Sequence, residues 1–186
     1  MTAHVVEQLQ DARNVLMLAS STSPDSGDLH HYLFGERTLD ESNVLVLTFG
    51  RADRGTPNET AIVQIDETLQ PSDSHPDNVT VQTVSPTDLT GVGMAVSDII
   101  KEWSSTDTKT VVCFNSVTDF LQYADQSTMY RFLRVVTRRF DAADGFAHFH
   151  MNPNAHDKQT IATLKSPFDA VIDASDGGEV SVSTQY

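Results

Sequence analysis

Three histidines have the spacing that could hold a metal ion. His148 and His150 are two positions apart in GFAHFHM (145–151), so on a strand they would face the same side, with His156 just beyond as a candidate third ligand. No Cys or well-spaced Glu completes a set. We therefore expect neither a metal nor a cofactor, and we assign no role to these histidines.

Nucleophilic catalysis has weak support. Ser, His and Asp are all frequent, but the sequence has no G-x-S-x-G element of the kind that exposes a serine at a strand-to-helix turn. The adjacent His30 and His31 would point about 100° apart on a helix and are typical of surface positions.

Four arginines form the most distinctive cationic feature. Arg131, Arg134 and Arg138 recur at i, i+3 and i+7 and line one helical stripe, with Arg139 beside it. One interpretation is a solvated face that pairs with the protein's own carboxylates. The other is a docking face for an acidic partner or a neighbouring subunit. Four arginines in a chain of net charge −14 do not indicate a DNA-binding surface.

The elements that must position these residues alternate between strand and helix patterns, which predicts an α/β fold with a mainly parallel sheet. Apolar or alternating runs predict strands over 14–20, 43–50, 61–66, 79–84, 110–116, 145–151, 168–173 and 179–186, the last pairing as a hairpin after the Gly177-Gly178 turn. Helical patterns predict helices over 28–36 and 88–103. A third helix is predicted to begin after the N-cap Ser127, with an inner face that includes Met129, Phe132, Leu133, Val136 and Phe140. A fourth is predicted to start at Asn154, with Asp157 three positions on.

Composition sets wider bounds. The 186 residues suit one domain, 1–186, and hold twelve bases against twenty-six acids, mostly Asp, with only four Lys. This surface is typical of a halophilic cytoplasm, although an acidic mesophilic protein is the alternative. No apolar run is long enough to span a membrane and no signal peptide is evident. The single Cys113 cannot form an internal disulfide, so we expect a cytoplasmic protein.

A resemblance covers about a third of the chain. The stretch 110–173 contains VVCFNS, a long arginine-bearing helix, a strand with a Pro-containing turn, and AHD…T…L…FDAV, and it resembles the second half of archaeal KaiC-like, RecA-superfamily ATPases. The resemblance implies a three-layer, RecA-like (P-loop NTPase-like) sheet with helices on both faces, here with a C-terminal hairpin. It also implies ATPase activity and side-by-side association of domains.

The phosphate loop departs from that family. In SSTSPDSGDL (20–29) only Gly27 remains of the motif, Asp28 stands where the family has Lys, and Leu29 stands where it has a hydroxyl. Pro24 removes a backbone N–H, and an Asp carboxylate repels phosphate.

The metal-directing Asp of the family is also replaced, by Asn115 before Ser116. Any remaining nucleotide binding would be weak and would use Ser23, Ser26, Gly27, Asp28, Asn115 and Ser116.

These departures predict a protein that is not an enzyme. We expect a non-catalytic, RecA-like regulatory or scaffolding protein that acts through protein–protein contacts in a halophilic archaeal cytoplasm. Its partner would be another protein, such as an intact KaiC-like paralogue, or a second copy of itself; neither membrane nor nucleic acid is expected. The alternative is a nucleotide-binding sensor or a slow, non-standard ATPase.

Overall fold

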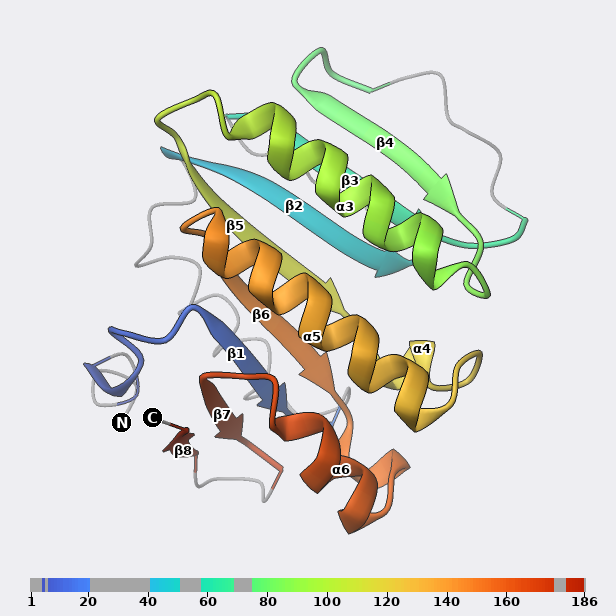
Figure 1. The fold of residues 1–186 in the computed structure, drawn as a ribbon, viewed down its shortest axis with the longest axis vertical. Coiled ribbons are helices and arrows are strands. Elements are labelled where there is room, and N and C mark those ends of the chain that lie inside the picture. Colours follow the sequence, from blue (N-terminus) through green and yellow to red (C-terminus); the bar gives the residue numbers. More distant parts are fainter. Residues whose placement is uncertain are drawn as a thin grey trace.

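The computed structural model of the protein describes residues 5, 7–20, 41–50, 58–68, 75–175 and 180–185. Their centre is one eight-stranded sheet in the order β4-β3-β2-β5-β6-β1-β7-β8 (Figure 1). The strands are β1 (Asn14–Leu18), β2 (Ser42–Phe49), β3 (Thr60–Ile65), β4 (Val79–Val84), β5 (Lys109–Asn115), β6 (Phe146–Met151), β7 (Ala170–Asp173) and β8 (Ser181–Thr184). All neighbours are parallel except β7 and β8, which confirms the mainly parallel sheet and its antiparallel C-terminal pair.

The described helices cover one face of this sheet. The three long ones, α3 (Leu89–Trp103), α5 (Gln126–Ala142) and α6 (Lys158–Lys165), run side by side in front of the strands, with α5 in the middle (Figure 1). The single-turn α4 (Val117–Phe120) follows β5, and the 3-10 helix η2 (Pro153–Ala155) follows β6. The predicted helix 28–36 and the Gly177-Gly178 turn lie outside the described residues.

Two predicted helix starts were wrong by a few residues. Asp125, not Ser127, caps α5, because its carboxylate accepts the Thr128 N–H, three residues further on, at 2.7 Å. Asp157 caps α6 through the Thr160 N–H at 2.7 Å, whereas Asn154 belongs to the preceding 3-10 turn. In both places the helix begins directly after the Asp, since its oxygens satisfy a backbone donor that the first helical turn leaves without a partner.

The sheet is buried on both faces, which explains why its central strands are continuous apolar runs. Towards the helices, residues such as Leu16, Phe114 and Phe149 pack against Leu133 and Phe140 of α5. The opposite face has a second cluster, formed by alternate residues of the same strands with the N-terminal segment, which comprises Val5, Leu9, Ala12, Val15, Met17, Val111, Cys113, Phe146, Ala170, Ile172 and Ala174. This alternation places Cys113 on the face that lies away from α3, α5 and α6.

None of the described helices combines the length and apolar character needed to cross a bilayer.

Candidate functional site

The carboxyl ends of β1, β5 and β6 surround a cavity of about 250 Å³. Ligands of open α/β sheets bind outside this edge, where strand connections diverge to opposite sides. The lining residues are Ala19, Ser20, Asn115, Ser116, Thr118, Asp119, His150, Met151 and Asn152. Asn115 and Ser116 are therefore placed together at this edge, while the other sequence-predicted nucleotide residues, Ser23, Ser26, Gly27 and Asp28, lie outside the described residues.

Most polar groups at this edge bind one another. Ser116 caps α4, and its hydroxyl lies 2.5 Å from the Asp119 carboxylate. Thr118 Oγ1 accepts the Asn152 N–H at 2.9 Å and lies 3.0 Å from His156 Nε2. Neither Lys nor Arg is among the described residues that line the cavity, so this part of the wall offers no cation to a phosphate.

His156 is separate from the other two histidines. It is held at Thr118, and its partial burial lowers the pKa of the imidazole below the usual 6.5, although nearby Asp157 opposes the shift. The candidate third ligand His156 does not belong to the group of ligand atoms that contains His148 and His150.

A cysteine takes that place instead. The register of β5 and β6 sets Cys113 opposite His148, and one ligand atom each of Cys113, His148 and His150 lies within 4.8 Å of the others. The two imidazole rings are 4.9 Å apart and nearly perpendicular. Cys113 and His148 are buried and His150 is half-buried. The sequence pattern therefore missed a Cys that lies beside the two histidines.

Sequence alone could not have joined these residues, because Cys113 and His148 are 35 positions apart and only the pairing of two strands brings them together. The available signal was that both belong to buried strands of one predicted sheet, TVVCF and GFAHFHM. Burial raises the pKa of the Cys113 thiol to about 12, so the thiol is protonated at neutral pH while no cation binds it.

The four predicted interaction arginines are all exposed on α5, but their surroundings differ. No carboxylate of the described residues lies within ion-pair distance of Arg131, Arg134 or Arg138, and Arg134 stacks over the Tyr130 ring at 5.8 Å. Arg139 instead ties α5 to α3, since its guanidinium donates to the Gly93 carbonyl at 2.7 Å and also contacts Ser97 Oγ. Arg139 is thus a helix-bridging residue, and we call the other three, Arg131, Arg134 and Arg138, the arginine stripe.

An apolar groove of about 340 Å³ lies next to this stripe, between α3 and α5. Its walls include Arg131, Phe132 and two exposed apolar side chains, Met94 at 62% and Val135 at 47% exposure. Exposed apolar area beside arginines is the composition of many protein interfaces.

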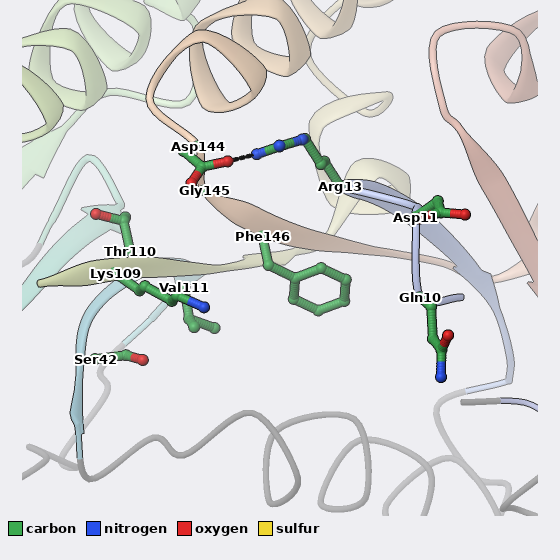
Figure 2. A pocket seen from close by; sticks show the side chains of 10 residues that line it. All are labelled: Gln10, Asp11, Arg13, Ser42, Lys109, Thr110, Val111, Asp144, Gly145 and Phe146. Atoms are coloured by element: carbon green, nitrogen blue, oxygen red, sulfur yellow. Dashed lines mark hydrogen bonds and ion pairs between the residues drawn. The ribbon is translucent and has the colours of Figure 1, made fainter. Parts of the chain in front are cut away.

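A further cavity, of about 440 Å³, lies at the amino ends of β5 and β6 (Figure 2). Arg13 points across it to Asp144 and also pairs with Asp141 at 3.5 Å. Arg13 is therefore paired with carboxylates of the protein itself. The cavity lies at the amino edge of the sheet, opposite to the carboxyl edge where ligands of this fold class bind.

These features define the class: an α/β protein built on an eight-stranded, mostly parallel sheet with a polar cavity at its carboxyl edge. The chain belongs to the family described as "Family of unknown function (DUF7504)", whose match spans residues 12–174. No curated protein matches it. A solved structure from Pyrococcus horikoshii OT3 is similar, with 12% identity and a TM-score of 0.61 over 100% of this chain and 93% of that one, which shows the shared fold.

Proposed function

We propose that this protein is a non-catalytic, RecA-like protein that acts through protein–protein contacts made by the outer face of α5. The observation that carries the proposal is the arginine stripe, whose three guanidinium groups are exposed and have no ion-pair partner among the described carboxylates. One of the three, Arg131, also lines the apolar groove. In a chain of net charge −14, three such arginines suit an acidic partner surface.

The RecA-like assignment is supported by the order of elements. The segment that resembles KaiC-like ATPases folds as β5, α4, α5, β6, η2, α6 and β7, in the sequence that the resemblance implies. The carboxyl ends of β1 and β5, which in that family carry the phosphate loop and the metal-directing Asp, border one cavity.

The residues at that cavity and in the preceding sequence support the proposed absence of catalysis. Phosphoryl transfer depends on positioned positive charge and a carboxylate-held Mg²⁺. Asn115 offers only a neutral amide at the end of β5. In the sequence that follows β1, Asp28 and Leu29 stand where the KaiC-like family has Lys and a hydroxyl. These replacements leave the developing charge of a transferred phosphate without stabilisation.

The partner that best fits the stripe is a second copy of this chain. Residues 1–93 hold four bases against fourteen acids, so a neighbouring copy supplies the acidic surface that Arg131, Arg134 and Arg138 require. An acid-rich half that meets the arginine stripe of the next copy gives a head-to-tail contact, and Met94 and Val135 add apolar area to it.

Light scattering tests this association. The triple variant R131S/R134S/R138S should lower the mass of the wild-type assembly towards that of the monomer, because it removes three cations from the contact. The matched control K101S/K109S/K158S changes three exposed lysines and the net charge equally, and it should leave the mass unchanged. A wild-type protein that is monomeric at all concentrations, or equal masses for the two triple variants, would contradict the proposed contact.

The same preparations test the absence of catalysis. Mg²⁺ and ATP should produce no turnover above background and no rise in melting temperature, since a tightly bound ligand must stabilise the folded state. A melting temperature that rises with ATP would favour the sensor, and turnover that disappears in Asn115→Ala would favour a divergent ATPase.

A further inference from the structure

We propose that Cys113, His148 and His150 form a transition-metal site, with Zn²⁺ as its representative ion. The proposal rests on their ligand atoms, which all lie within 4.8 Å of one another on the sheet face opposite α3, α5 and α6. It is independent of the arginine stripe, which lies on the other side of the sheet.

The distances suit coordination after a small contraction. Zn²⁺ is held at about 2.3 Å from a cysteine sulfur and about 2.0–2.1 Å from a histidine nitrogen, so tetrahedral ligand atoms lie roughly 3.3–3.6 Å apart. Ligand atoms that are up to 4.8 Å apart therefore need to approach by up to about 1.5 Å, which side-chain rotation can provide. Their strands are already fixed, because β5 and β6 pair through Cys113 and His148 in the centre of the sheet.

The donor set selects the kind of ion. One thiolate and two imidazoles suit Zn²⁺ or copper, whereas Mg²⁺ and Ca²⁺ require oxygen ligands. No carboxylate of the described residues belongs to the cluster. Coordination replaces the thiol proton with the metal ion and releases that proton to solvent, and the positive ion then offsets the cost of a thiolate in this buried position.

The position also provides an entry path. His150 is half-buried and lines the 250 Å³ cavity at the carboxyl edge, next to Asn115, while Cys113 and His148 lie deeper in the sheet. An ion can thus reach the site from the cavity, and a fourth coordination position on that side can be taken by water.

Co²⁺ and Zn²⁺ binding to the full chain tests the site. Co²⁺ in place of Zn²⁺ should give a near-ultraviolet thiolate-to-cobalt band with one ion per chain, and Zn²⁺ should abolish that band by competition. Cys113 is the only cysteine, so the band reports this residue alone. Changes in outer-sphere partners alone weaken metal affinity about 10–100-fold, so His150→Gln should weaken Zn²⁺ binding by at least about a hundredfold.

The matched control is His156→Gln, which changes the histidine bound to Thr118 and should leave both the band and the affinity unchanged. Cys113→Ser should abolish the band, and circular dichroism shows whether each variant keeps the fold. His150 is only half-buried, so we expect His150→Gln to fold even if Cys113→Ser does not. The His150→Gln variant alone then decides the test. Binding without a thiolate band, or equal Zn²⁺ affinity in His150→Gln and His156→Gln, would show adventitious binding by surface histidines and overturn the proposal.

Discussion

At the scale of single residues, aspartates cap three of the described helices in this acidic protein. Asp88, Asp125 and Asp157 each accept a backbone N–H at the start of a helix, and in this position a negative charge also interacts favourably with the helix dipole. The excess of Asp is therefore structural at these positions, in addition to its contribution to the net charge.

The cap of α6 predicts a pH effect. The Thr160 N–H lowers the pKa of Asp157 below its usual 3.8, so the stabilisation by the carboxylate is present above that value and is lost as the pH falls through the folded-state pKa. Asp157→Asn keeps a cap that does not titrate. Urea unfolding should show the variant gaining stability relative to wild type between pH 6 and pH 3. A constant difference over that range would contradict this role of the charge.

At the scale of elements, α5 has two faces with different tasks. Its inner face is buried at Met129, Leu133, Val136 and Phe140, as the helical pattern predicts, and Phe132 is partly buried. Its outer face carries Arg131, Arg134 and Arg138, whereas Arg139 reaches sideways to α3. One helix thus anchors the fold and presents the proposed contact surface, and the two tasks can be separated by mutation.

Two substitutions on α5 test that separation. Leu133→Ala should lower the free energy of unfolding by about 2–5 kcal/mol, because a fully buried side chain leaves a cavity under the sheet. Arg134→Ala, one residue along, should change it by less than about 0.5 kcal/mol. Chemical denaturation followed by circular dichroism measures both, and similar losses would mean that the stripe is structural rather than a contact surface.

At the scale of the whole molecule, the charged side chains of the described residues lie at the surface and the apolar side chains of the sheet form the core. The strands bury apolar side chains on both faces, and nearly all of the charge is left at the surface. Where both partners are described residues, the ion pairs are those of Arg13 with Asp141 and Asp144. The excess acids therefore repel one another across the folded surface, as self-repulsion predicts for a chain far from neutrality.

Salt should consequently stabilise this protein. Between about 0.1 M and 1 M KCl the Debye length falls from about 10 Å to about 3 Å, which screens repulsion among the carboxylates. We expect the melting temperature to rise steadily over this range, with most of the gain retained in the R131S/R134S/R138S variant because the effect is spread over the surface. Equal stability at low and high salt would contradict the halophilic interpretation.

The sequence by itself determined the elements. Strand and helix periods located the described strands and long helices within a few residues, since burial on both faces produces continuous apolar runs and burial on one face produces a helical stripe. The errors were at helix starts, where Asp125 and Asp157 competed with Ser127 and Asn154 as caps.

Only the tertiary structure decided which chemical groups meet. The order and register of the strands set Cys113 beside His148 and placed Asn115 and His150 on one cavity wall. His156 contacts Thr118 and lies outside the group formed by Cys113 and the two other histidines. Packing of α5 against α3 likewise distinguished four exposed arginines, since Arg139 binds the Gly93 carbonyl of α3 and the other three do not contact α3 through a hydrogen bond among the described residues. These are contacts between residues far apart in the chain, and local sequence periods record which face a residue occupies but not which neighbour it meets.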